Sequence, residues 1–178
     1  MFTKREVIHL TITILLLTFI FGFDDGRKTF IAKYWFLNLL GVLLITAFSI
    51  LFREAVIKYK AKKHETESTY EIWRVKKFWF KGAESKTGIP FGIVIALITI
   101  LVSKGKMYFT AVGIHKLHEN VERRTGRRRI YLQDYERAMI CLYGMWASVV
   151  LAILGVAIGI KMLITVNLFL VLFLELHY

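Results

Sequence analysis

LFREAVIKYKAKKHETESTYEIW, residues 51–73, is the stretch that decides the fold. It closes a run of 19 uncharged residues that begins at Tyr34, turns basic at residues 58–63, and then alternates polar with β-prone residues. A bilayer core of about 30 Å needs roughly 20 helical residues. The stretch therefore predicts a membrane helix over residues 34–57, a basic exit from the membrane, and a small β-prone segment near residues 64–73.

Other apolar runs extend this pattern over the whole chain. They predict further helices at residues 6–23, 138–160 and 162–176, the last of them being the weakest. The chain has 178 residues, 56% hydrophobic, with one proline and one cysteine. The lone Cys141 excludes an internal disulfide, and the composition excludes a typical soluble domain. We expect an all-α multi-pass membrane protein of about four transmembrane helices, forming a single membrane domain over residues 1–178.

The distribution of positive charge predicts the topology. Of the 25 Lys and Arg residues, 10 lie at positions 53–86 and 9 at positions 104–137. The positive-inside rule places both basic segments, about 58–88 and 115–137, in the cytoplasm together with the N-terminus. An even number of crossings must then separate them. The apolar, Gly- and Pro-containing residues 89–114 fit a re-entrant or interfacial hairpin, whereas a short Gly-flanked interfacial helix is the alternative.

Residues 53–57, Arg-Glu-Ala-Val-Ile, carry a family resemblance. Their context, an apolar helix that turns basic and then β-prone, resembles the active-site region of the site-2 protease family of intramembrane zinc metalloproteases, in particular its short archaeal members. The resemblance implies that H-E-x-x-H has become Arg53-Glu54-Ala55-Val56-Ile57. Two histidines at i and i+4 share one helix face and bind one zinc ion, whereas arginine and isoleucine offer no lone pair. We expect the motif to be vestigial, with no catalytic residue and no zinc cofactor. The preferred interpretation of Glu54 itself is an ordinary pair with Lys58, four residues on, at a helix end.

The resemblance also covers the C-terminal half by pattern. Residues 127–151 resemble the family's entry to its next core helix, with Ser148 where asparagine is common. The third zinc ligand of the family, an aspartate, has no counterpart at residues 164–178. Glu54, Ser148 and Asn167, with Arg53, are expected to be the polar residues nearest a lateral cleft that binds transmembrane segments or a partner membrane protein. Gly144 and Ser148 predict close helix packing, and Asn167 predicts a hydrogen bond to a neighbouring helix.

Two other interpretations remain open. The first is a metalloprotease with displaced ligands, drawn from Glu54, His64, His115, His118, Glu175 and His177. Of these, His115 and His118 are weak metal candidates, since i and i+3 on a helix can chelate a metal ion, although a cationic amphipathic helix over residues 114–124 is preferred. The second is a small structural or assembly subunit of a larger membrane complex.

Basic and aromatic residues predict contact with anionic lipid headgroups rather than nucleic acid, because no RNA-binding motif accompanies them. The expected headgroup residues are Lys58, Lys60, Lys62, Lys63, Trp73, Arg74, Lys76, Lys77, Trp79, Arg127, Arg128 and Arg129.

Overall fold

Helices dominate the described part of the chain, which in this computed structural model covers residues 2–24, 26–27, 29–77, 84–103, 105, 107–119 and 133–173. The helices are α1 (Lys4–Gly22), α2 (Ala32–Lys63), α3 (Phe91–Ser103), α5 (Asp134–Ile158) and α6 (Lys161–Phe173). The strands are β1 (Thr66–Ile72), β2 (Val75–Lys77), β3 (Glu84–Ile89) and β4 (Gly113–Glu119).

Three of these helices, α1, α2 and α5, are long and apolar enough to cross a membrane, with 19, 32 and 25 residues. The expected helical architecture with a small β segment is therefore present. The fourth span is not supported at full length, because α6 has 13 described residues. At 1.5 Å per residue such a helix is about 20 Å long, which is shorter than a bilayer core of about 30 Å.

Helix α2 is longer than the sequence predicted. It was expected to end at residue 57, yet it continues through the basic residues to Lys63. Lysine, alanine and tyrosine at residues 58–63 contain no helix breaker, and lysines in the last turn interact favourably with the helix dipole. The helix ends at His64, and Glu65 adopts a left-handed conformation with φ 56° before β1 begins.

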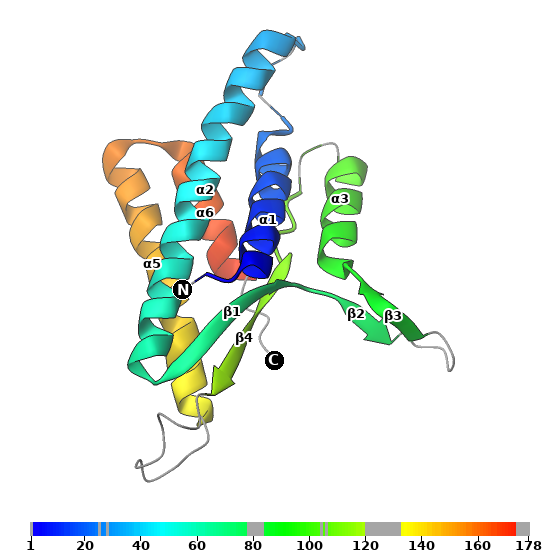
Figure 1. Cartoon of the computed structure of the whole chain (residues 1–178). Helices are drawn as coiled ribbons and strands as arrows, with labels where there is room; N and C mark the ends of the chain where they lie inside the picture. The colour runs from blue at the N-terminus through cyan, green and yellow to red at the C-terminus, as the bar shows by residue number, and fades with distance from the viewer. Residues whose placement is uncertain are drawn as a thin grey trace.

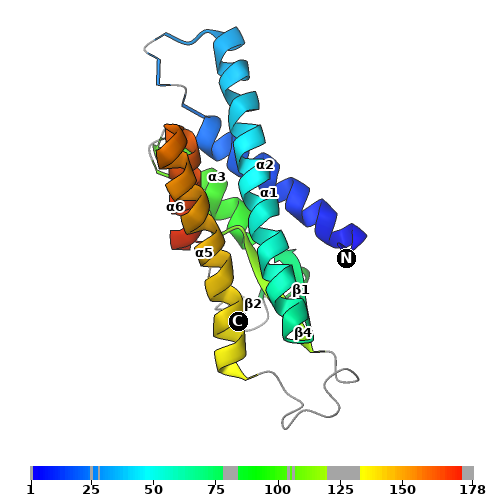
Figure 2. The same cartoon turned by 90° about the vertical axis from the view of Figure 1, so that its left-hand side faces the viewer.

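The long helices pack side by side (Figures 1 and 2). Helix α1 runs antiparallel to α2, and α5 lies along the opposite side of α2. Helix α6 folds back along α5 and also contacts α2, whereas α3 contacts α1 at the other end of the row. The small sheets lie together at one end of the helices, where α2 ends and α3 begins (Figure 1).

Strands β1 and β4 pair antiparallel, with Thr66 opposite Glu119 and Ile72 opposite Gly113. Between them in the sequence, β2 and β3 form a second sheet, α3 leads away from β3, and residues 107–112 lead back to β4 (Figure 1). Gly105 lies at the turn with φ +82°, and a Cβ there would meet the Phe23 ring at 2.9 Å. Residues 89–114 thus include a helix and a returning segment that connect β3 of one sheet to β4 of the other.

The returning segment is packed into the bundle. The Tyr108 ring lies 5.2 Å from the ring of Phe21 in α1 and 5.1 Å from that of Phe169 in α6. The Thr110 hydroxyl donates a hydrogen bond to the Phe169 carbonyl oxygen at 3.1 Å. These contacts connect the hairpin to α1 and α6.

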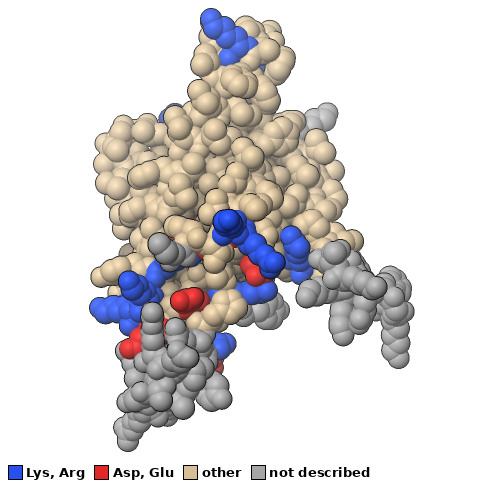
Figure 3. Space-filling view, in the orientation of Figure 1, with Lys and Arg blue, Asp and Glu red and all other residues tan. Residues whose placement is uncertain are grey.

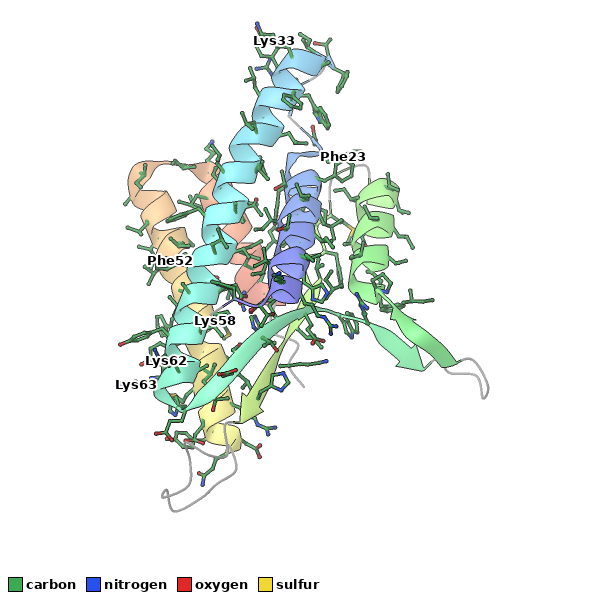
Figure 4. All side chains as sticks on the ribbon, in the orientation of Figure 1. Phe23, Lys33, Phe52, Lys58, Lys62 and Lys63 are labelled. Atoms are coloured by element: carbon green, nitrogen blue, oxygen red, sulfur yellow. The ribbon has the colours of Figure 1, made fainter. Side chains whose placement is uncertain are left out.

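Charged side chains lie at the two ends of the molecule, with a broad uncharged band between them on the face seen in Figure 3. Lys33 marks one end of α2, and Lys58, Lys62 and Lys63 mark the other, beside the sheet (Figure 4). Charged side chains are rare on surfaces that contact a bilayer core, so this band is compatible with membrane insertion.

Candidate functional site

The motif residues of α2 lie inside the protein. Arg53 and Glu54 are each 1% exposed and Ile57 is 2% exposed. The Arg53 guanidinium donates a hydrogen bond from Nη1 to the carbonyl oxygen of Leu170 in α6, at 3.0 Å. Ile57 packs against α5, where a Cβ added to Gly144 would lie 2.8 Å from the isoleucine Cδ1. Because residues four apart share a helix face, Arg53 and Ile57 together fill the side of α2 that faces α5 and α6.

Glu54 faces the sheet instead. Its Oε1 lies 3.2 Å from Nε2 of His115 in β4. The His115 ring meets the Tyr70 ring edge-on at 5.4 Å, and the Tyr70 hydroxyl shares a 3.0 Å hydrogen bond with Thr13 of α1. Burial raises the pKa of Tyr70 above its usual range, so this hydroxyl stays protonated at neutral pH. A line of polar contacts therefore joins α2 to α1 through both strands.

Glu6 in α1 was not singled out from the sequence, yet its buried carboxylate has several polar partners. Its carboxylate forms an ion pair with Lys58 at 2.7 Å and accepts a hydrogen bond from the Tyr70 backbone N–H at 3.1 Å. It also closes a capping box with Thr3. The signal was available, because Thr3-Lys4-Arg5-Glu6 is a T-x-x-E pattern before an apolar run. We call Glu6, Arg53, Glu54, Lys58, Tyr70 and His115 the polar cluster.

The expected pairing of Glu54 with Lys58 does not occur. Lys58 binds Glu6 and also donates to the Ser68 carbonyl oxygen at 3.1 Å. Glu54 is directed towards His115. Adjacent packing of α1 against α2 brings Glu6 within reach of Lys58, and a tertiary ion pair replaces the local one.

The other predicted polar residues belong to helix contacts. Asn167 donates a hydrogen bond to the Ser49 hydroxyl at 3.0 Å, which is the predicted bond to a neighbouring helix. Ser148 is fully buried, and Gly144 allows the close approach of α5 to α2 that its size predicted. Two grooves beside β1 are lined by other side chains and include none of Glu54, Ser148 and Asn167.

The helix expected over residues 114–124 is wrong for its first part. Residues 113–119 form β4, because they pair with β1 along its whole length. Side chains three apart in a strand point to opposite faces, so His115 is buried towards Glu54 while His118 is exposed in a groove. Within the described residues, no three His, Cys, Asp or Glu side chains gather as metal ligands. His177 and Glu175 lie outside those residues.

The basic residues expected at lipid headgroups have different surroundings. Lys62, Lys63 and Arg74 are exposed, while Lys60 lies over the Tyr143 ring at 3.8 Å. Trp73 packs edge-on against Phe91 at 5.5 Å. Lys76 and Lys77 belong to β2, although their side chains are outside the described part, as are Trp79, Arg127, Arg128 and Arg129 as whole residues.

The chain was compared with protein-family models, with curated proteins and with solved structures, and none of the three comparisons found a match. The geometry of the polar cluster and of the helix surfaces is therefore the basis for a functional proposal.

Proposed function

We propose that this protein is an integral membrane scaffold of site-2 protease type without protease activity, which binds transmembrane segments of other membrane proteins. One observation carries the loss of activity. In the resemblance, Arg53 and Ile57 stand where zinc-binding histidines would be, and here they are packed against α6 and α5. Glu54, at the position of the family's catalytic glutamate, has its Oε1 3.2 Å from His115 Nε2. A water-activating zinc site needs three protein ligands and an open fourth position, and the packing around α2 favours a structural role instead.

The uncovered face of α2 supports segment binding. Leu37, Leu40, Leu44, Phe48 and Leu51 are 47–67% exposed and recur at intervals of three and four residues. That spacing forms a continuous apolar stripe along one helix face, which is the pattern of a helix–helix seam. We propose that a transmembrane helix of another protein packs against this stripe, in competition with lipid acyl chains.

The proposed orientation places the sheets in the cytoplasm. The beginning of α1, the end of α2 and the start of α5 all lie at the sheet end of the molecule (Figures 1 and 2). That end carries Lys58, Lys60, Lys62 and Lys63. Since cytoplasmic loops carry the excess of Lys and Arg, we place this end and the N-terminus inside the cell and let α3 enter and leave from that side.

Photo-crosslinking from the stripe tests the segment-binding proposal. A photoreactive phenylalanine analogue replaces Leu44 in one variant and Val156 in a control, whose side chain on α5 is similarly exposed at 64%. The probe is a biotinylated, leucine-rich transmembrane peptide in the same liposomes. We expect several-fold more cross-linked peptide from position 44. Equal yields from the two positions, or cross-links only between copies of this chain, would overturn the proposal.

Restoring the two histidines tests the loss of zinc chemistry. We expect the Arg53→His, Ile57→His double variant to retain no stoichiometric zinc after loading and desalting, and to leave a model membrane substrate uncut. The physical reason is that two histidines facing α5 and α6 hold catalytic zinc poorly, whereas the nearby His115 lies on the Glu54 side of α2. A triple variant that adds Glu54→Gln is the control, because any cleavage that it still shows comes from a contaminating protease. Zinc near one per chain, with cleavage that the triple variant lacks, would contradict the prediction.

A further inference from the structure

A groove of about 770 Å³ lies between the start of α1 and the paired strands β1 and β4. Arg5 and His9 line it from α1, Arg74 follows β1, and Lys116 and His118 come from β4. The two carboxylates of its lining are Glu6 and Glu71. Basic groups from three separate segments thus converge on one opening.

Both carboxylates are already paired. Glu6 is buried and bound to Lys58, which lies outside this groove. Glu71 is 2.6 Å from the Lys116 ammonium, whose hydrogen bond, opposed in part by desolvation, holds the pKa of that carboxyl below its usual range. Nearby His9 and His118 act on Glu71 in the same direction as Lys116. Both carboxylates are therefore engaged by lysines, and neither compensates the charge of Arg5 or Arg74.

Arg5 and Arg74 are both exposed, and in the described part of the chain no carboxylate forms an ion pair with either of them. A guanidinium presents a planar set of donors that matches phosphate oxygens in a bidentate arrangement. Two such groups at one groove, with lysine and histidine between them, are suited to a phosphate group rather than to a lone carboxylate.

The surface above the groove is apolar. Ile8, Ile12 and Leu15 are 58%, 39% and 56% exposed, and they continue along α1 from the level of Arg5 and His9. On the other side, Trp73 packs against Phe91 at the base of α3, and tryptophan prefers the boundary between headgroups and acyl chains. A ligand held by the arginines would therefore have its apolar part beside α1 and α3.

We propose that this groove binds the phosphate of an anionic phospholipid, with Arg5 and Arg74 holding the phosphate oxygens and the acyl chains lying along α1. The inference rests on the membrane placement in the proposed function but not on segment binding. A soluble phosphate ester has the same charged group, but it lacks acyl chains that could lie along Ile8, Ile12 and Leu15.

Lipid binding by the purified full chain in detergent tests this proposal. The probe is dioctanoyl phosphatidylglycerol, titrated in native mass spectrometry or calorimetry, with dioctanoyl phosphatidylcholine as the zwitterionic comparison. The variant is Arg5→Gln, Arg74→Gln. Its control is Lys4→Gln, Lys63→Gln, which removes two exposed positive charges of the same end without touching the groove lining. We expect the arginine variant to bind phosphatidylglycerol roughly 10- to 100-fold more weakly and the control to bind it nearly unchanged.

Each other outcome overturns a part of the proposal. Equal weakening in both variants would mean attraction to surface charge without a site, and equal binding of phosphatidylcholine would mean that the negative charge is not recognised. Displacement of the lipid by millimolar inorganic phosphate or glycerol phosphate would assign the groove to a soluble ligand. An unchanged melting temperature of the arginine variant excludes misfolding as the cause of weaker lipid binding. An unchanged cross-link from position 44 in that variant shows that lipid binding and segment binding fail independently.

Discussion

Glu6→Leu is expected to destabilise the protein by about 3 kcal/mol, the size typical of removing one partner from a buried ion pair. The change leaves the Lys58 ammonium, whose side chain is 17% exposed, without its carboxylate. It also removes the acceptor of the Tyr70 backbone N–H and one half of the capping box at the start of α1. The free energy of unfolding, measured by denaturant titration in detergent micelles, reports the loss.

Another glutamate–lysine pair in the same chain provides the control. Glu71 and Lys116 lie 2.6 Å apart, but their side chains are 41% and 48% exposed. An exposed pair contributes about 0.2–1 kcal/mol, so Glu71→Leu is expected to have a far smaller effect. The double variant Glu6→Leu, Lys58→Met removes both buried charges and is expected to recover part of the stability. Equal losses for Glu6→Leu and Glu71→Leu would contradict the central position assigned to Glu6.

Gly92→Ala is expected to cost about 1–3 kcal/mol, because one added methyl group has no space. A Cβ at position 92 would lie 2.7 Å from the carbonyl oxygen of Val112 and 2.8 Å from that of Ala111. Both atoms belong to the backbone of the returning segment, so relief requires α3 or that segment to move. The expected result is a lower melting temperature in micelles and faster proteolysis between α3 and β4.

The matched control is Gly41→Ala in α2. A Cβ there meets nothing within 4 Å, and alanine is favoured over glycine inside a helix by roughly 0.5–1 kcal/mol. The same chemical change is thus expected to destabilise at position 92 and to be neutral or stabilising at position 41. A similar loss of stability at both positions would show that the close contact of Gly92 with the backbone of Ala111 and Val112 is not what excludes a larger residue at position 92.

The parts of the fold that depend on local pattern were predictable. Apolar runs located the cores of α1, α2 and α5, and the alternation at residues 64–73 indicated β1. The strand β4 was missed, because residues 113–119 carry no clear alternation of their own and become a strand by pairing with β1. Local periodicity contains no information about a partner that lies far along the chain.

The candidate site was predictable only in part for the same reason. Arg53 and Ile57 could be recognised from the sequence as replacements of the two motif histidines, because a helical spacing of four residues is a local feature. The partners were not: Leu170 is 117 residues from Arg53, and Glu6 is 52 residues from Lys58. Tertiary packing selects such partners, and a buried glutamate in the first turn of an apolar helix looks in the sequence like an ordinary exposed one.

The pairing of β1 with β4 has a consequence for biosynthesis. Strand β1 emerges from the ribosome well before β4, so β1 has no partner strand while α1 and α2 are already synthesised. Helix α3 has 13 residues, which is too short for an ordinary transmembrane span. The segment that follows it is held in place only after Gly113 and the following residues have paired with β1. Assembly of this half of the protein therefore depends on contacts that are distant in sequence, and such contacts form slowly because loop closure must precede them.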